Sequence, residues 1–191
     1  MSRVIVMNQV TLDGVMQSPA RADEDTRDGF ALGGWAVERS DDAIVAKMGE
    51  RMGADHAFPF GRRTYEELLR TWNARGGPFK DALNETPKFV ASSDPETRLE
   101  WPSSTLLHGD VPGAIAQLKE RSGADLVIMG SGVLIRSLIA ADAIDEYLLM
   151  IHPIVLGTGR RLFETGTRTS LRLLECSSTR TGVVLAIYER G

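Results

Sequence analysis

A strand pattern runs directly into two glycines and then into a helix pattern after residue 125. Leu126 to Met129 is apolar without interruption, Gly130-Ser131-Gly132 follows, and apolar residues at helical spacing begin at Val133. Such a junction points unpaired backbone N–H groups, and the positive end of a helix, at whatever lies above it, and phosphate suits that place. The alternative is a tight turn that serves packing only, and on its own this junction is more often such a turn.

The junction matches neither of two familiar phosphate-binding motifs. Ile135 stands where the Rossmann pattern has its third glycine, and Asp145 is predicted at the start of a strand, whereas the acidic residue of that pattern ends one. The chain has no Gly-Lys-Ser/Thr, so it contains no P-loop. A phosphate role therefore depends on what the rest of the chain places beside the junction.

Composition limits the class of protein. The chain has 191 residues, 42% hydrophobic and 25% charged, which is ordinary for one soluble domain with a full core. Its 22 basic and 26 acidic residues are mixed along the chain, which disfavours nucleic acid as a partner. The single cysteine, Cys176, excludes an intramolecular disulfide, and the first apolar run is too short for a signal peptide or membrane span. We expect one cytoplasmic domain over residues 1–191, without a membrane partner.

Strand and helix patterns alternate along the chain. Strands are expected at 3–9, 56–60, 88–91, 105–108, 126–129 and 144–151, with helices at 40–52 (capped by Ser40), 64–72, 111–121 and after 132, and a glycine-rich loop at 73–78. This order predicts an α/β fold with a mostly parallel sheet and helices on both faces. Arms at 170–178 and 182–190 predict a terminal hairpin that adds an antiparallel edge. Residues 15–39 form a long loop, which in a compact domain is usually functional or mobile.

Three of the predicted strands end in polar or glycine-rich segments. These are Gly61-Arg62-Arg63-Thr64, Ser92-Ser93 and the 130–132 junction, and two of them open a helix. Ligands of open α/β sheets bind outside the carboxyl ends of the strands, so two helix starts, two arginines and two hydroxyls would share one crevice. Arginine beside hydroxyl groups favours the extra phosphate of NADP over the ribose hydroxyl of NAD.

The same segments carry a family resemblance. Phe60 to Glu66, Lys88 to Ser93 and Val127 to Gly132, in this order and at these intervals, resemble the dihydrofolate reductase fold. The start and end of the chain resemble the riboflavin-biosynthesis (pyrimidine) reductase branch, through Thr11-Leu12-Asp13-Gly14-Val15, Asp145 to Leu148, Pro153 to Gly159 and Leu162-Phe163. The resemblance implies a single-domain three-layer sandwich, NADPH as cofactor, hydride transfer to a small pterin- or pyrimidine-like heterocycle, and a homodimer.

The resemblance also implies residue roles. The cofactor would lie against Asn8, Gly61, Arg62, Arg63, Thr64, Ser92, Ser93, Gly130, Ser131, Gly132, Val133 and Leu134. The substrate would contact Phe30 and Trp35 in the long loop and Leu156, Gly157 and Gly159 in a later turn. Phe30 and Trp35 either close over a flat ring or anchor the loop on the core. The turn at 157–160 either touches substrate or is only a rigid connection.

No catalytic acid stands out. Asp13 and Asp41 are weak candidates: Asp13 suits a turn, and Asp41 suits a helix start. The resemblance to dihydrofolate reductases implies a buried carboxylate on the first helix, which would help to hold and protonate a pterin. The interior face predicted for the helix at 40–52 carries no acid, which disfavours folate as the substrate. The three histidines lack metal-ligand spacing, so we expect no metal site, and Cys176 is expected in the core. Two other functions stay open: reduction of an unrelated carbonyl or imine with the same cofactor, and a non-catalytic NADP sensor.

Overall fold

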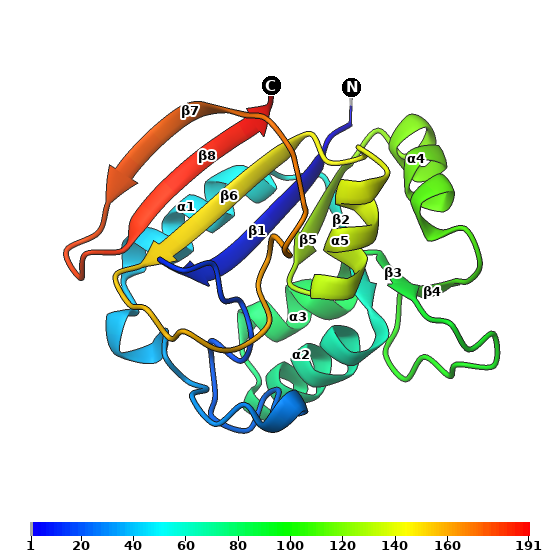
Figure 1. The fold of residues 1–191 in the computed structure, drawn as a ribbon. Helices are drawn as coiled ribbons and strands as arrows, with labels where there is room; N and C mark the ends of the chain where they lie inside the picture. Colours follow the sequence, from blue (N-terminus) through cyan, green and yellow to red (C-terminus); the bar gives the residue numbers. More distant parts are fainter. Residues whose placement is uncertain (1) are drawn as a thin grey trace. The chain divides into compact units, whose positions relative to one another are not determined.

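The computed structural model describes residues 2–191 (Figure 1). The chain packs as two compact units, each made from two stretches of sequence. Unit 1 runs up to Val4 and resumes over Met52–Ala143, and unit 2 comprises Ile5–Arg51 and Ile144–Gly191. The expectation of one domain over 1–191 stays a prediction.

Unit 1 contains four parallel strands and four helices. The strands are β2 (His56–Gly61), β3 (Lys88–Ala91), β4 (Ser104–Leu107) and β5 (Asp125–Met129). They lie in the order β4-β3-β2-β5, and each neighbouring pair is parallel. The helices are α2 (Arg62–Arg75), α3 (Pro78–Glu85), α4 (Val111–Arg121) and α5 (Gly132–Ala140), with α2 and α3 next to each other (Figure 1). The centres of β2 and β5 are buried, as expected of strands in a parallel sheet.

Unit 2 contains the other strands, in the order β1-β6-β8-β7. These are β1 (Val4–Thr11), β6 (Glu146–His152), β8 (Val184–Arg190) and β7 (Leu171–Ser178). β1 and β6 are parallel with Thr11 opposite His152, whereas β8 is antiparallel to both of its neighbours. Helix α1 (Asp42–Met52) lies across one face of these strands (Figure 1), where Arg51 pairs with the buried Glu146 of β6. The loop between β1 and α1 contains two short 3-10 turns, η1 (Arg27–Gly29) and η2 (Val37–Arg39).

The fold class predicted from the sequence is confirmed. The four strands of unit 1 are parallel, and unit 2 adds the parallel pair β1 and β6 and an antiparallel hairpin at the C-terminal end, as a mostly parallel α/β fold requires. The predicted helix at 111–121 coincides with α4, and the predicted hairpin arms differ from β7 and β8 by at most two residues.

Three local predictions are wrong. The glycines of 73–78 predict a loop, but α2 continues to Arg75 and the unpredicted helix α3 begins at Pro78. Helix α1 begins at Asp42, and its cap is not Ser40 but Asp41, whose Oδ1 accepts the N–H of Ala43 at 3.0 Å. Cys176 is exposed rather than in the core, because β7 is the last strand of its unit and its residues are largely exposed.

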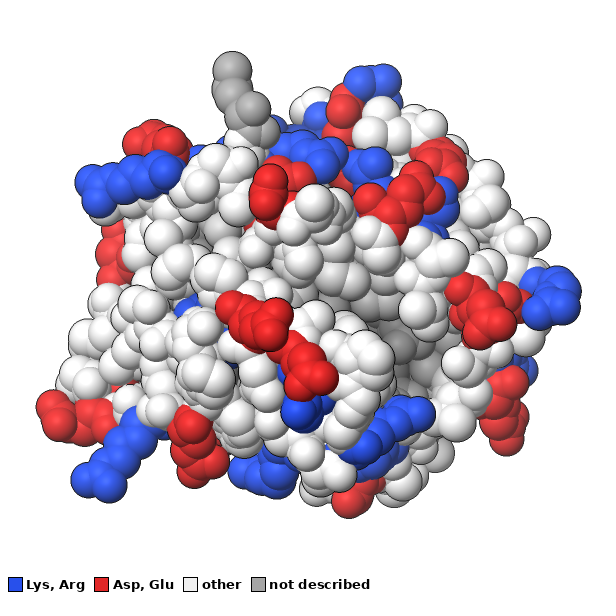
Figure 2. Space-filling model, turned by 180° about the vertical axis from the view of Figure 1, so that it is seen from behind, with Lys and Arg blue, Asp and Glu red and all other residues white. Residues whose placement is uncertain are grey.

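The surface shows no single dominant charge on the face drawn in Figure 2, where acidic and basic side chains are intermixed. Within the described part of the chain, no helix combines the length and the apolar character needed to cross a bilayer. Residues 2–191 also hold no group of three or more His, Cys, Asp or Glu side chains that could bind a metal ion.

Candidate functional site

In unit 1 a serine joins two of the predicted cofactor segments. The hydroxyl of Ser131 accepts the backbone N–H of Gly61 at 2.6 Å, so the residues that precede α5 and α2 are linked directly. Ser131 has a left-handed backbone with φ of 67°, and Gly130 before it has φ of 82°. Two successive left-handed residues reverse the chain within the junction, which favours glycine at 130 and costs about 1 kcal/mol or more at the serine. The strand is therefore broken by a strained turn that brings α5 and α2 together.

Neither α2 nor α5 has a side-chain cap at its N-terminus. The N-cap of α2 is Gly61 and that of α5 is Ser131, and neither makes a side-chain capping bond to its own helix. The Ser131 hydroxyl is instead engaged with Gly61. Uncapped first turns combine free N–H donors with the positive end of the helix dipole, which is the arrangement that binds phosphate. The residues predicted to hold pyrophosphate thus fit an anion.

The arginines of the α2 start differ in their partners. Arg62 forms an ion pair with Glu66 one turn along the helix, at 2.9 Å. Arg63 is exposed, and no ion pair of Arg63 is present in the described part of the chain. An exposed pair such as Arg62–Glu66 is worth about 0–1 kcal/mol, so an incoming phosphate could compete with Glu66 for Arg62. The α2 start therefore offers one unpaired guanidinium and a second that is weakly held.

Ser92 has a structural role of its own. Its hydroxyl lies 2.7 Å from that of Thr97 and accepts the N–H of Asp94 at 3.2 Å, which shapes the turn after β3. Ser93 is exposed. Ser93 is consequently the freer hydroxyl of the pair for a ligand on this side of unit 1.

In unit 2, Asp13 is fixed in a structural clamp. Its carboxylate accepts the hydroxyl of Thr11 at 2.6 Å and the N–H groups of Leu156 and Gly157 at 3.2 and 2.8 Å. The Thr11 hydrogen bond and these two N–H groups hold the pKa of the Asp13 carboxyl well below its usual range. A carboxylate stabilised so strongly in its ionised form is a poor proton donor, so the geometry supports the turn role over the catalytic one.

Phe30 and Trp35 are loop anchors in this structure. Both rings are buried, at 5% and 7% exposure, in a cluster with Val15 and Ala36. The ring of Phe30 also packs on Gly159: a Cβ there would come within 2.7 Å of the ring, and the backbone φ of 109° independently favours glycine. This packing is what the loop-anchor alternative predicts, and a contact of these rings with substrate stays a prediction.

Two polar side chains of β1 and β6 are buried with an atom unsatisfied. Asn8, predicted to back the nicotinamide, is 4% exposed, and its Oδ1 has no hydrogen-bond partner within residues 2–191. His152 is fully buried, with Nε2 2.9 Å from Oε1 of Gln9 and its ring edge-on to Trp35 at 5.2 Å. Burial, with the charge of Arg39, lowers the pKa of His152 to about 4, so the ring is neutral at pH 7.

Asp41 is the candidate carboxylate that borders a cavity. Its side chain is 5% exposed, and one oxygen caps α1 while the other lies 3.9 Å from the guanidinium of Arg180. The cavity measures about 380 Å³ and is lined by Ser40, Asp41, Asp42, Arg180 and Thr181. That volume falls within the range of small-molecule pockets. Of Asp13 and Asp41, Asp41 is thus the one with access to a space that a ligand could occupy.

Sequence reasoning overlooked Gln17 as an organising residue of unit 2, and it did not pair Gln9 with His152. Each is polar within a segment that is otherwise apolar or loop-like, and each is paired with a group far away in the sequence. A polar residue at the end of an apolar run, as His152 is after Tyr147 to Ile151, was the available signal.

Comparison with known proteins agrees with this arrangement. The model of the RibD C-terminal domain family matches residues 2–185. The protein YyaP of Bacillus subtilis is 35% identical over 75 residues, a stretch that covers 39% of this chain and 40% of that protein. The match thus spans well under two thirds of this relative.

Two solved structures share the fold over nearly their whole length. A putative riboflavin biosynthesis protein from Shewanella is 24% identical with a TM-score of 0.66, and the match covers 99% of both chains. Dihydrofolate reductase from Enterococcus faecalis, solved with NADP(H), is 15% identical with a TM-score of 0.65, and the match covers 99% of this chain and 96% of the reductase. The fold is thus that of dihydrofolate reductase, and the family match over almost the entire chain shows that the protein belongs to the RibD C-terminal domain family.

Proposed function

We propose that this protein is an NADPH-dependent reductase that transfers hydride to a small heterocycle of the pterin or ribosylamino-pyrimidine type. The observation that carries the proposal is the pair of uncapped helix starts, α2 and α5, held together by the hydrogen bond from Gly61 to Ser131. Family membership and the dihydrofolate reductase fold support a reductase. NADPH, when bound, would supply the hydride.

Unit 1 provides the groups that would hold the phosphates. The first N–H groups of α2 and α5 would bind the pyrophosphate, since neither helix uses them for a side-chain cap. Arg63, with Arg62 released from Glu66, would bind the 2′-phosphate, and Ser93 would lie along the adenosine end. The same junction favours glycine at two positions: Gly130 has a left-handed φ of 82°, and a Cβ on Gly61 would come within 3.0 Å of the Ser131 hydroxyl.

Unit 2 provides the groups that would meet the heterocycle. Asn8, which would lie against the nicotinamide, presents a buried acceptor oxygen without a partner among residues 2–191, and this oxygen suits an amide N–H of the cofactor. Asp41 would hold or deliver a proton, because its carboxylate borders a cavity, whereas Asp13 is committed to the backbone of the 156–157 turn. Leu156, Gly157 and Gly159 would contribute through the shape of that turn.

We also propose that the protein forms a homodimer. Strand β7 is the last in its unit and exposes Leu173 and Leu174 at 51% and 44%. A long edge strand with exposed apolar residues readily pairs with another chain. Sedimentation analysis at increasing concentration tests this proposal: a mass that stays at 20.9 kDa would reject it.

The test of the function is turnover. Purified protein with NADPH is offered dihydropterin, ribosylamino-pyrimidine and simple carbonyl or imine acceptors, and loss of NADPH absorbance is followed. Oxidation with a heterocycle supports the proposal, and oxidation only with a carbonyl or imine would replace the substrate class. NADPH binding without turnover on any acceptor would instead favour a sensor.

A further inference from the structure

The loop between β1 and α1 is more firmly held than a mobile covering segment would be. Its first part pairs with the chain that follows β6: Leu12 N–H donates to Ile154 C=O at 2.9 Å, and Met16 N–H donates to Arg160 C=O at 2.9 Å. From the other side, Leu162 N–H donates to Gly14 C=O at 3.0 Å. Both segments follow the carboxyl ends of β1 and β6, where ligands of α/β sheets bind.

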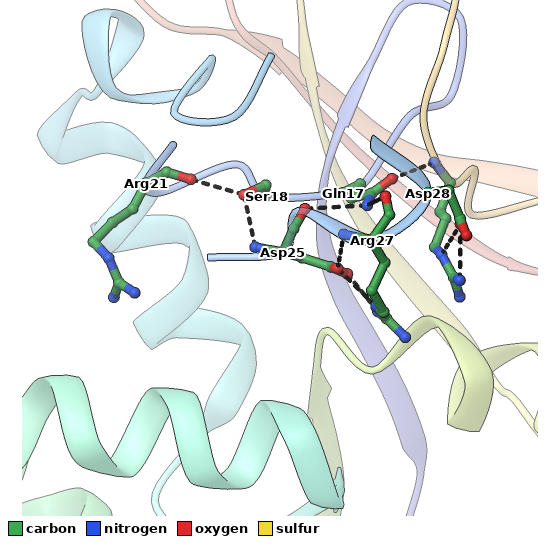
Figure 3. A network of polar contacts seen from close by, with 7 residues as sticks. Gln17, Ser18, Arg21, Asp25, Arg27 and Asp28 are labelled. Carbon is green, nitrogen blue, oxygen red and sulfur yellow. Dashed lines mark hydrogen bonds and ion pairs between the residues drawn. The ribbon is translucent and has the colours of Figure 1, made fainter. Parts of the chain in front are cut away.

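Gln17 joins the rest of this loop to the same turn. Its side chain is 4% exposed; its Nε2 donates to the C=O groups of Asp25 and Arg27, both at 3.1 Å, and its Oε1 accepts the N–H of Arg160 at 2.9 Å. Figure 3 shows the Gln17 side chain with dashed lines on both sides. Those on one side lead to Asp25 and Arg27, and the one on the other side leads to the unlabelled residue drawn beside Asp28. The C=O of Gln17 also accepts Nε1–H of Trp35 at 2.8 Å. One residue therefore connects three parts of the loop with the turn after β6.

Only a side-chain amide of this length can make these bonds together. The two carbonyl partners require a donor, and the N–H of Arg160 requires an acceptor, so the orientation of the Gln17 amide is fixed by its partners. A glutamate in its place would keep one acceptor but would set a carboxylate against two carbonyl oxygens. A methionine would fill the space and make none of the bonds.

Neighbouring groups reinforce the same arrangement. The hydroxyl of Ser18 donates to Arg21 C=O at 2.7 Å and accepts Asp25 N–H at 3.0 Å. Arg160 forms an ion pair with Asp28 at 2.9 Å, and Arg27 pairs with Asp25 through Nε at 2.7 Å. The cavity left between the loop and the turn is only about 180 Å³, below the size usual for a ligand pocket. The network therefore serves to join the two segments.

We propose that Gln17 is a positioning residue that holds residues 17–35 as a fixed wall against the turn after β6, the turn proposed to contact the substrate, and that this wall is already in place before any ligand binds. Through Trp35, which lies edge-on to His152, the wall is anchored to the end of β6, and His152 is itself paired with Gln9 of β1. The part that concerns the substrate rests on the proposed reductase function; the fixed loop does not.

The test compares Gln17→Glu and Gln17→Met with Asn73→Asp. Asn73 is a half-buried amide of unit 1 that donates to Leu69 C=O at 2.8 Å, so its substitution makes the same chemical change elsewhere. Hydrogen exchange is followed at Gly34 and Ala36, whose N–H groups bond within the loop, at 2.8 Å to Ser18 and 3.0 Å to Pro19. At pH 8 we expect exchange at these amides to rise at least tenfold in both Gln17 variants and to stay unchanged in Asn73→Asp.

A pH series adds a readout that loss of packing would not produce. When the carboxylate introduced by Gln17→Glu is protonated, it regains an O–H donor. The excess exchange of that variant, corrected for the intrinsic rate, should therefore shrink between pH 8 and pH 5, while that of Gln17→Met should not. No increase in either Gln17 variant, or an equal increase in Asn73→Asp, overturns the proposal. So does wild-type exchange that slows tenfold at these amides when NADPH is added, because the loop would then close on ligand.

Two further measurements, KM for the acceptor and Kd for NADPH, distinguish failure of the fixed loop from failure of the proposed reductase function. With an acceptor that is turned over, Gln17→Glu should raise KM for the acceptor at least fivefold and leave the Kd for NADPH unchanged. If wild-type protein binds no NADPH while the exchange results hold, the reductase function fails and the fixed loop stands. If the Kd for NADPH changes as much as KM, the wall does not act on the substrate and that part is overturned.

Discussion

The hydroxyl of Ser131 accepts the backbone N–H of Gly61 at 2.6 Å, although 70 residues separate the two in the sequence. This bond engages the Ser131 hydroxyl away from its own helix, and the starts of α2 and α5, both without side-chain caps, are linked through it in unit 1. The phosphate-binding role proposed for unit 1 depends on it.

Ser131→Ala should weaken this link. Gly61 N–H would lose its acceptor, which for a half-buried donor costs about 1–3 kcal/mol of unfolding free energy. NADPH affinity should fall as well, because the N-termini of α2 and α5 are no longer linked by a hydrogen bond. Ser137→Ala, on the same helix, removes a hydroxyl that donates to Leu134 C=O and is the matched control. Equal losses of NADPH affinity in both variants, measured by titration, would contradict the role of Ser131.

Arg62→Ala combined with Arg63→Ala should weaken NADPH far more than NADH. The two cofactors differ by the 2′-phosphate, and a charge-assisted hydrogen bond to a charged group is worth about 1.5–3 kcal/mol. We expect a loss of at least tenfold in NADPH affinity with NADH nearly unchanged, measured by fluorescence titration. Arg70→Ala, further along α2 and paired with Glu67, should affect neither cofactor. Parallel losses for NADPH and NADH would remove the 2′-phosphate assignment.

Asp41→Asn separates helix capping from proton transfer. Asparagine caps helices about as well as aspartate, so the unfolding free energy should change by less than about 1 kcal/mol. NADPH oxidation should fall at least tenfold, because the amide cannot hold or deliver the proton. Asp42→Asn, one residue later in the same cavity wall, is the control. Full turnover in Asp41→Asn would show that its carboxylate only begins the helix.

His152 predicts a specific pH dependence of stability. Its pKa falls from 6.5 when the chain is unfolded to about 4 when folded, because burial disfavours the charged ring. The unfolded state then binds more protons between these values, so stability is full above pH 6.5 and is lost as pH falls toward 4. The loss is at most about 3 kcal/mol. His152→Gln should flatten the denaturation free energy across this window; an unchanged slope would count against a neutral, buried ring.

Much of the fold was predictable from local signals. The 126–132 segment places a strand, a turn and a helix start within a few residues, and the structure has all three. Helix α3 was missed because Gly76-Gly77 and Pro78 indicate a loop, and eight residues are too few for a clear helical period. Cys176 shows the same limit for burial, since an alternating strand pattern does not reveal which strand lies at the edge of a sheet.

The site was predictable in part. The cofactor segments of unit 1 were indicated by glycines and arginines at strand ends, because that chemistry is local in sequence. A turn role for Asp13 was indicated by its position, but its bonds to Leu156 and Gly157, and that of Gln17 to Arg160, were not, since these partners are backbone N–H groups 143 and 144 residues away that carry no sequence signal. Phe30 and Trp35 were equally compatible with a substrate contact and a loop anchor until the packing of Val15 and Gly159 was known.

Thermal unfolding of the wild-type protein with NADPH, with NADH and with neither shows directly whether the protein binds NADPH in preference to NADH. Ligand at a hundred times its Kd adds about 2.7 kcal/mol of stability. For a chain of this size each kcal/mol raises Tm by roughly 2–4 °C. We expect a rise of about 5–11 °C with NADPH and little change with an equal concentration of NADH. No rise with either cofactor would contradict this expectation and would leave Gly130-Ser131-Gly132 as a turn that serves packing alone.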